Sequence, residues 1–468
     1  YKLRDAVFSR QRYWGEPFPV YYKDNFPVMI DEKYLPIELP DVSKYLPTED
    51  GKPPLGNSDS WAWDTVQNKI VDNFHIDNKT VFRMELNTMP GWAGSSWYFN
   101  RYMDPNNSNE FASEESLNYW KEVDVYIGGS EHATGHLLYS RFWQYFLYDL
   151  GLVPVKDYAK KLINQGMILG NSAFIKREVG SDNYYSAEIN KDVKTQLIHV
   201  DVQFVNTSNE LDIVKLRNWQ PQFKKANFET NDNKFTVCRE VEKMSKSKYN
   251  VINPDDICED YGADTLRLYE MFLGPLEQAK PWNTAGITGT YSFLKKYWNL
   301  FHRSGSFKVS QEKPSNESLK VLHKTIRKIE DDINNFSFNT SVSAFMICVN
   351  ELNSLKCDNI HILKPLTILL SPFAPHICEE IWSKLGNKKT ISYESFPDFN
   401  AEFIKESAFE YPVSFNGKMK FKINLDVSLK VDEIKSSLRN DPRLEKFLIS
   451  REVKKIIVVP GKIINIVC

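Results

Sequence analysis

A short run of lysines and serines is the segment of this chain whose residue types best suit chemistry. Lys243-Met244-Ser245-Lys246-Ser247 is followed at once by Lys248, which gathers ammonium and hydroxyl donors in one place. Such donors suit a polyphosphate whose charge shifts during a reaction. The alternative is a solvated surface loop, since short matches of this kind also arise by chance. Asn253 is placed to cap a helix that starts at Pro254, which favours a fixed loop and therefore phosphate chemistry.

A second candidate site begins at Gly128-Gly129. These glycines follow a short apolar segment, 123–127, that is typical of a strand, and they precede a predicted helix over 131–150. At such a junction backbone amides face a ligand, and Glu131 is placed to reach a ribose hydroxyl. The helical period predicts that the following side chains are buried: Leu137, Leu138, Phe142, Tyr145 and Phe146.

His132 and His136 are one helical turn apart and share a face of that predicted helix. Three interpretations are open for this pair: ordinary packed or surface histidines, a metal-binding pair, or part of the wall of a substrate pocket. We favour the pocket wall, because the residues between them lack the glutamate of a zinc hydrolase helix. Trp92 and the aromatic segment 97–99 lie among small residues, which is typical of core packing or of a shaped hollow.

Arginines and aromatic residues alternate near the start of the chain. Ser9-Arg10-Gln11-Arg12-Tyr13-Trp14-Gly15 mixes guanidinium groups with aromatic rings. This composition is typical of surfaces that stack bases and clamp phosphates. The end of the chain is also basic, because residues 411–468 hold twelve Lys and Arg against six Asp and Glu.

The overall composition is that of an ordinary soluble protein. Hydrophobic residues make up 42% and charged residues 26% of the chain, and the formal net charge is −2. No apolar run reaches the roughly 18 residues of a membrane span. The six cysteines form no Cys-x-x-Cys pair, so we predict reduced thiols, a cytosolic protein and no zinc site. The chain starts with Tyr1 and runs straight into a motif, so we expect it to be entered midway through a longer one.

Hydrophobic periodicity predicts the elements that position these residues. An apolar segment at 162–169 follows the first strand at parallel-crossover distance, which predicts part of a doubly wound α/β sheet. Alternation near 197–204 predicts a strand-rich insert. Helical periods predict a bundle whose buried faces carry Leu319, Leu322, Ile326, Ile329 and Ile333, and Val342, Phe345, Val349 and Leu352. The predicted boundaries are 1–169 for the sheet, with an irregular lead-in to about 64; 170–238 for the insert; 239–283 for the lysine loop and its following helices; 284–400 for the bundle; and 411–468 for a small α+β domain.

Taken in order, these motifs resemble bacterial leucyl-tRNA synthetases, a branch of the class I aminoacyl-tRNA synthetases. The valyl and isoleucyl branches share the lysine loop, written KMSKS. The run Tyr126-Ile127-Gly128-Gly129-Ser130-Glu131-His132-Ala133, followed by His136-Leu137-Leu138-Tyr139, resembles the leucyl branch in particular. The likeness covers essentially the whole chain and also includes Ser95-Ser96-Trp97-Tyr98, Gln165-Gly166-Met167, Tyr261-Gly262-Ala263-Asp264-Thr265-Leu266-Arg267 and Ser371-Pro372-Phe373-Ala374-Pro375-His376.

The resemblance implies a fold and an activity. The fold is a partial class I Rossmann-like catalytic domain with a leucine-specific-type insert, then stem-contact helices, an α-helical anticodon-binding-type bundle and a small α+β domain that contacts tRNA. The activity is ATP-dependent activation of leucine and its transfer to tRNA(Leu). ATP is a substrate that brings Mg²⁺ with it. The parent enzyme is implied to be monomeric and cytoplasmic.

The resemblance also implies roles for individual residues. The implied catalytic residues are Lys243, Ser245, Lys246 and Ser247, with Lys246 also binding the ATP phosphates. The implied ATP-binding residues are Gly128, Gly129, Glu131, Gln165, Gly166 and Met167. The implied leucine-binding residues are Trp92, Tyr98, Tyr126, His132 and His136. Arg10 and Arg12 are implied to meet the 3′ end of the tRNA.

One departure from the family limits what we expect of this chain by itself. The first ATP signature of the family, His-Ile-Gly-His, occurs nowhere in the sequence, and neither does an editing insert. We therefore expect the C-terminal portion of a longer enzyme, which lacks the N-terminal half of the catalytic domain and is inactive alone. The alternatives are a valyl- or isoleucyl-type synthetase, and a non-catalytic RNA-binding module derived from a synthetase.

Overall fold

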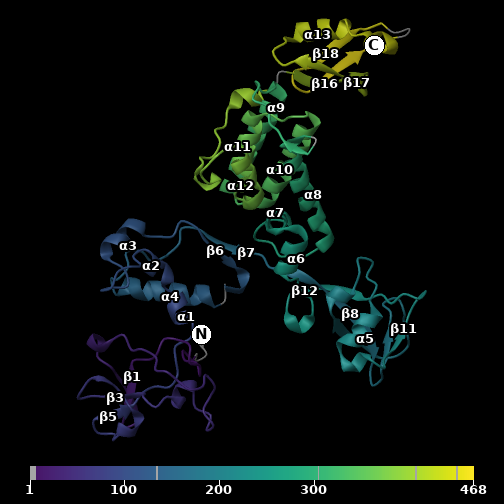
Figure 1. Cartoon of the computed structure of the whole chain (residues 1–468). Coiled ribbons are helices and arrows are strands. Elements are labelled where there is room, and N and C mark those ends of the chain that lie inside the picture. Colours follow the sequence, from purple (N-terminus) through teal and green to yellow (C-terminus); the bar gives the residue numbers. More distant parts are fainter. Residues whose placement is uncertain (1–6, 133–134, 304, 406–407, 449–451) are drawn as a thin grey trace. The chain divides into compact units, whose positions relative to one another are not determined.

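The chain is a mixed α/β protein, seen here in a computed structural model (Figure 1) that describes residues 7–132, 135–303, 305–405, 408–448 and 452–468. It divides into two compact units. The first unit comprises Tyr1–Met167 with Glu277–Ala279, and the second comprises Ile168–Leu276 with Lys280–Cys468. Each unit is described by itself.

The first part of unit 1 is built from short strands. A hairpin joins β1 (Val20–Lys23) to β2 (Phe26–Met29), and its turn residues have the positive φ angles typical of a type I′ turn. A small antiparallel sheet has the order β4 (Lys69–Val71), β3 (Ala62–Asp64), β5 (Val81–Arg83). The predicted irregular lead-in is therefore more ordered than its prolines suggest, because a core forms from Tyr13, Ile30, Leu55, Trp61, Trp63 and Met84.

The second part of unit 1 combines helices with a parallel strand pair. The helices are α1 (Trp92–Ser95), α2 (Tyr98–Tyr102), α3 (Glu114–Trp120) and α4 (His136–Asp149). The strands are β6 (Tyr126–Gly129) and β7 (Leu162–Gln165), which pair in parallel. The predicted helix over 131–150 starts later than expected, because a 3₁₀ turn occupies Ser130–His132. The predicted strand over 162–169 is also divided, since its last residues begin β8 in the second unit.

The buried face of α4 differs from the predicted one. Leu138 is 66% exposed and Phe142 is 69% exposed, and Tyr145 and Phe146 are exposed as well. Ser140 and Gln144 are buried instead. Their polar atoms are satisfied there, because Ser140 Oγ lies 2.9 Å from the Tyr158 hydroxyl, and the Gln144 side chain bonds to Asn100 and to the Val155 carbonyl. Paired polar groups can thus face inwards where periodicity alone predicts an apolar face.

The second unit opens with a six-stranded sheet. Its path is β10 (Thr195–Val200), β8 (Ile168–Glu178), β9 (Asn183–Tyr185), β11 (Asn227–Glu229), and both β12 (Cys238–Lys243) and β13 (Lys280–Pro281) also pair with β8. The alternation predicted through 204 ends at Val200, because Asp201 caps a 3₁₀ turn over Val202–Phe204. Helix α5 (Ile213–Trp219) packs on this sheet region around Leu216. The strand that leads into the lysine loop therefore belongs to the same sheet as the insert.

Helices follow the lysine loop. They are α6 (Pro254–Tyr261), α7 (Ala263–Phe272), α8 (Ile287–Leu300), α9 (Asn316–Asn334), α10 (Phe338–Ser354), α11 (Ile360–Leu370) and α12 (Pro375–Lys384), with a small pair of strands, β14 (His302–Arg303) and β15 (Ser306–Phe307), between α8 and α9. The predicted bundle faces are confirmed: Leu322, Ile326 and Ile329 are buried on α9, Leu319 and Ile333 pack beside them, and Val342, Phe345, Val349 and Leu352 are buried on α10.

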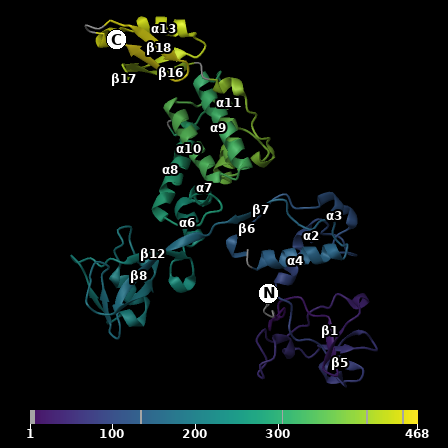
Figure 2. The same ribbon diagram turned by 180° about the vertical axis from the view of Figure 1, so that it is seen from behind.

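The last part of the chain is a four-stranded sheet with two helices. Figure 2 labels α13 beside β16, β17 and β18 of this part. The strand order is β17 (Lys418–Asp426), β16 (Ala408–Phe415), β19 (Ile463–Val467), β18 (Lys455–Val459), and the helices are α13 (Val431–Arg439) and α14 (Pro442–Phe447). The predicted hairpin at Asn416-Gly417 is confirmed, and both residues have positive φ. This part has its own core around Ile434, Leu438 and Ile464.

Candidate functional site

A cavity of about 480 Å³ lies in unit 1 at the end of β6. Its lining includes all five side chains that the sequence suggested for an amino-acid pocket: Trp92, Tyr98, Tyr126, His132 and His136. Gly128 and Gly129 line the same cavity. Helices α1, α2 and α4 and strand β6 therefore bring residues far apart in sequence to one hollow.

A chain of hydrogen bonds runs along one wall of this cavity. The Tyr126 hydroxyl lies 2.9 Å from the Tyr98 hydroxyl and 2.6 Å from Nε2 of His136. Burial, followed by the hydrogen bond with Tyr98, raises the pKa of Tyr126 above its ordinary value. Burial, followed by the charge of His132, lowers the pKa of His136. Both shifts favour uncharged groups near neutral pH, so this wall suits an apolar guest.

The residues proposed to hold a nucleotide are less closely gathered. Gly128 and Gly129 pair with Asn164 and Gln165 across the parallel strands. Gln165, Gly166 and Met167 do not line the cavity, although Asn164 does. Glycine at position 166 is required by a close approach, because a Cβ there would lie 2.0 Å from the Gln278 backbone. The side chain of Glu131 lies outside the described residues.

The lysine loop lies in unit 2, where Lys243 is the last residue of β12 and the rest of the loop follows. Lys243, Lys246 and Ser247 are exposed, and the Ser245 hydroxyl lies 3.1 Å from that of Ser247. The helix start predicted after the loop is confirmed: α6 begins at Pro254, and Asn253 Oδ1 accepts a hydrogen bond from the Asp255 amide. The loop therefore presents its first two lysines and a serine to solvent from between two regular elements.

The arginines near the start of the chain lie on the surface of unit 1. Arg10 and Arg12 are exposed, and Arg10 donates to the carbonyls of Val7 and Ser9. Trp14 is 74% exposed and stacks on Tyr45 with a ring separation of 5.6 Å. This segment thus exposes both guanidinium groups and an aromatic ring, and such a combination suits contact with RNA.

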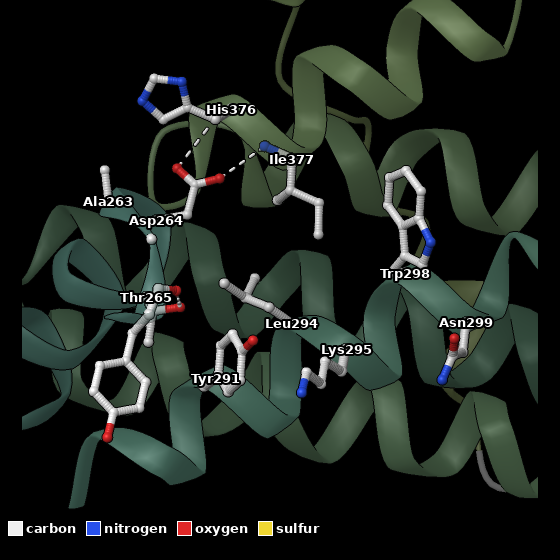
Figure 3. A pocket seen from close by; sticks show the side chains of 12 residues that line it. Ala263, Asp264, Thr265, Tyr291, Leu294, Lys295, Trp298, Asn299, His376 and Ile377 are labelled. Carbon is white, nitrogen blue, oxygen red and sulfur yellow. Dashed lines mark hydrogen bonds between the residues drawn. The ribbon is translucent and has the colours of Figure 1, made fainter. Parts of the chain in front are cut away.

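Two motifs that the sequence left without a role meet in unit 2 (Figure 3). The Asp264 carboxylate accepts hydrogen bonds from the backbone amides of His376 at 3.2 Å and Ile377 at 2.7 Å. Arg267 donates to the Pro372 carbonyl at 2.9 Å. Asp264 therefore satisfies the first amides of α12, whose own cap residue, Ala374, has no side-chain acceptor. Sequence reasoning missed this link, because the two motifs are more than a hundred residues apart.

A hollow of about 660 Å³ opens beside this junction. Helix α8 contributes Tyr291, Lys295 and Trp298 to its lining, and the Lys295 ammonium lies 4.1 Å from the centre of the Tyr291 ring. His376 lines it from α12. The junction between α7, α8 and α12 thus carries aromatic and cationic groups at its surface.

The part of the chain that the structure describes contains neither a metal-binding cluster nor a membrane-spanning helix. No group of three or more His, Cys, Asp and Glu side chains is gathered there as a metal ion would require. No described helix combines the length and apolar character needed to cross a membrane.

Two segments of the chain match families of tRNA ligases. Residues 316–435 match the family described as anticodon-binding domain of tRNA ligase, and residues 214–282 match tRNA synthetases class I (I, L, M and V). The first covers α9 to α12 and the start of the last sheet, and the second covers the lysine loop.

Relatives match the chain along its whole length. The leucine–tRNA ligase of Flavobacterium psychrophilum is 61% identical over 470 residues, covering 100% of this chain and 49% of that protein. The leucine–tRNA ligase of Christiangramia forsetii is 57% identical over 492 residues, covering 100% of this chain and 51% of that protein. The chain therefore spans about half the length of the curated relatives it matches.

A solved structure is also similar to this chain. It is the ternary complex of Agrobacterium radiobacter K84 agnB2 LeuRS with tRNA and LeuAMS, with a TM-score of 0.63 and 26% sequence identity. The match covers 99% of this chain and 52% of that one. Over its whole length, this chain is therefore homologous to leucine–tRNA ligases.

Proposed function

We propose that the protein represented by this chain activates leucine with ATP and transfers it to tRNA(Leu). The observation that carries the proposal is the unit 1 cavity, where Tyr98, Tyr126 and His136 form a hydrogen-bonded wall. Identity of 61% to a leucine–tRNA ligase supports it. The family match to class I synthetases for I, L, M and V makes valine and isoleucine the alternative substrates.

In the activation step, the leucine carboxylate attacks the α-phosphorus of ATP and pyrophosphate leaves. The carboxylate is already ionised near neutral pH, so this step needs no general base. Lys246, supported by Lys243, would neutralise the charge that develops on the departing phosphates, and Ser245 and Ser247 would donate hydrogen bonds to them. Removing one donor of this kind typically lowers the rate by about 10² to 10³.

The remaining contacts with leucine and ATP follow from the same proposal. The leucine side chain would occupy the cavity lined by Trp92, Tyr98, Tyr126, His132 and His136. The backbone at Gly128 and Gly129 would face the nucleotide, with Glu131 on the ribose and Gln165, Gly166 and Met167 at the adenine. ATP would enter with Mg²⁺ on its phosphates, as a substrate rather than as a resident cofactor.

Contacts with tRNA would be spread along the chain. Arg10 and Arg12 would meet the 3′ end, and the exposed Trp14 beside them suits an unpaired base. Residues 284–400 would bind the anticodon side of the tRNA, which the family match over 316–435 supports. Residues 170–238 would be the leucine-specific-type insert, residues 239–283 the KMSKS loop with stem-contact helices, and residues 411–468 a domain on the outer corner of the tRNA. We propose a monomeric enzyme that acts in the cytoplasm.

ATP–pyrophosphate exchange tests the activity. The protein assayed contains this chain and is as long as the curated relatives. We expect exchange that depends on leucine and not on valine or isoleucine. Lys246→Ala should lower it by about 10²-fold or more, whereas the matched control Lys313→Ala, at an exposed lysine of the same unit, should not. Stronger exchange with valine or isoleucine would favour the alternative substrates, and exchange that survives Lys246→Ala would refute the role of the loop.

The chain by itself provides a second test. We expect residues 1–468 to bind tRNA without forming leucyl-adenylate, because their sequence contains no His-Ile-Gly-His signature. If residues 1–468 bind tRNA, and neither they nor the full-length protein forms leucyl-adenylate, a non-catalytic RNA-binding module would be favoured. Adenylate formation by residues 1–468 would contradict our expectation.

A further inference from the structure

The lysine loop contains a residue in an unfavourable backbone conformation. Tyr249 ends the 3₁₀ turn over Lys246–Lys248, with φ 51° and ψ 34° in the left-handed region. A bulky residue adopts this region only where its surroundings hold it, since its Cβ crowds the following carbonyl. The contacts of Tyr249 therefore indicate what fixes the end of the loop.

The strand-rich insert supplies these contacts. The Trp219 ring meets the Tyr249 ring edge to face, with centroids 4.6 Å apart and planes at 87°. The Val202 amide donates to the Tyr249 carbonyl at 3.1 Å, and Gln220 Nε2 lies 3.4 Å from the Tyr249 hydroxyl. Trp219 ends α5, and Val202 begins the 3₁₀ turn after β10. The insert therefore holds both the ring and the backbone of Tyr249.

A second set of contacts ties Lys248 to the sheet of the insert. The Glu242 carboxylate accepts from Ser172 Oγ at 2.7 Å and from His199 Nε2 at 3.1 Å, and it pairs with Lys248 Nζ at 3.0 Å. These contacts lower the pKa of Glu242 to about 2, so the group is ionised at neutral pH. Ser172 and His199 belong to β8 and β10, so the sheet of the insert anchors Lys248 through Glu242.

Asn250 joins the two sets of contacts to the first half of the loop. Asn250 as a residue is 1% exposed. Its Oδ1 accepts a hydrogen bond from the Ser245 amide at 2.9 Å, and its Nδ2 donates to Ser172 Oγ at 2.8 Å. Glycine is needed opposite, because a Cβ at Gly170 would lie 2.8 Å from the Asn250 carbonyl oxygen. The exposed Lys243 and Lys246 thus belong to a loop held at three points: the Ser245 amide, the Lys248 side chain, and the backbone and ring of Tyr249.

We propose that the insert sets the position of the lysine loop through Glu242 and Tyr249, which act as positioning residues. Lys248 is then a tether, and Lys243 and Lys246 are the lysines left to meet phosphate. The proposal rests on the function proposed above insofar as it assigns ATP to this loop. Its structural part, a loop held by the insert, stands independently of that function.

Tryptic cleavage at Lys243, Lys246 and Lys248 measures how firmly the loop is held, without reference to activity. In the full-length protein, Trp219→Ala and Glu242→Gln should each raise the cleavage rate by about tenfold, as expected for the loss of one ring contact or one charge-assisted hydrogen bond. Trp219→Phe keeps a ring and should restore most of the protection. Val214→Ala, at a 71% exposed position on the same helix, is the matched control. Urea midpoints equal to that of the parent protein would show that the variants remain folded.

Steady-state exchange kinetics test the consequence for function. Glu242→Gln and Trp219→Ala should raise the KM for ATP by about tenfold and leave the KM for leucine within about twofold. Unchanged cleavage and an unchanged KM for ATP in both variants would overturn the proposal, and so would an equal rise in both KM values. If the parent protein shows no leucine-dependent exchange, the proposed function fails, while the cleavage rates still decide whether the insert holds the loop.

Discussion

Tyr126 is the residue on which the wall of the unit 1 cavity depends most. Its hydroxyl joins Tyr98 to His136, and its ring stacks against His136 with a plane angle of 18°. A hydroxyl shared by two partners leaves both unsatisfied when it is removed. The geometry of the wall thus depends on one oxygen atom.

The first prediction concerns this oxygen. Tyr126→Phe should lower the free energy of unfolding by about 1 kcal/mol, the usual net value of such a hydrogen bond, and should weaken leucine binding. Urea denaturation measures the first effect, and the KM for leucine measures the second. Tyr102→Phe, at a 74% exposed tyrosine on α2, is the matched control. Equal urea midpoints for both variants would contradict the prediction.

The second prediction concerns His136 and pH. Burial lowers its pKa below the ordinary value of 6.5, so the unfolded chain binds this proton more readily than the folded chain. The contribution of His136 to stability is therefore full above pH 6.5 and is lost as the pH falls through the lower pKa of the folded state. Urea midpoints should rise between pH 5.5 and 7.5, and less so in His136→Gln. A similar change in slope for His75→Gln, at an exposed position, would show that the effect is not specific.

Helices α7 and α12 are joined by Asp264, and this link acts at the scale of whole elements. Asp264 is 7% exposed, and its carboxylate takes the place of an N-cap for a helix that begins at Pro375. Because Asp264 itself lies in the first turn of α7, one side chain fixes the start of one helix to the start of another. Asp264, His376 and Ile377 all line the hollow beside α8 (Figure 3).

The third prediction tests that link. Asp264→Ala leaves the His376 and Ile377 amides without their acceptor and should lower the free energy of unfolding by about 1 to 3 kcal/mol. Asp260→Ala, at an exposed residue on α6, should change it by less than about 0.5 kcal/mol. Chemical denaturation of the two variants gives the comparison. A loss of equal size in both would assign the effect to charge rather than to the helix start.

At the scale of the whole molecule, the chain is a series of parts with separate cores. The bundle core, which includes Phe345 and Trp382, is distinct from the core of the last sheet around Leu438 and Ile464. The last part carries the excess of basic residues, and three of these are already paired: Lys422 with Glu410, Lys435 with Asp432 and Arg443 with Asp441. Its remaining lysines give it a positive field that the chain as a whole, with net charge −2, does not have.

The fourth prediction follows from this uneven charge. Affinity for tRNA should fall steeply with salt, because bound lysines release counterions from the phosphates. Removing residues 408–468 should weaken binding and reduce the slope of log K against log salt, while the separate bundle core remains folded. Binding measured between about 50 and 200 mM salt gives both slopes. A slope unchanged by the deletion would place the phosphate contacts elsewhere.

The sequence by itself determined those features that depend on neighbours along the chain. The helix start at Asn253, the hairpin turn at Asn416-Gly417 and the buried faces of α9 and α10 follow from capping, turn chemistry and helical period, and all three are confirmed. The aromatic and histidine residues of the cavity were also identified, because their motifs resemble a family. These features were therefore predictable from local sequence rules and from motifs shared with a family.

Only the tertiary structure decided which residues meet across long distances. It turned α4 so that the paired Ser140 and Gln144 lie inside while Phe142 is exposed, because satisfied hydrogen bonds can outweigh an apolar period. It also joined Asp264 to α12 and Trp219 to Tyr249. Such contacts depend on how separate elements pack, and neither periodicity nor motif spacing contains that information.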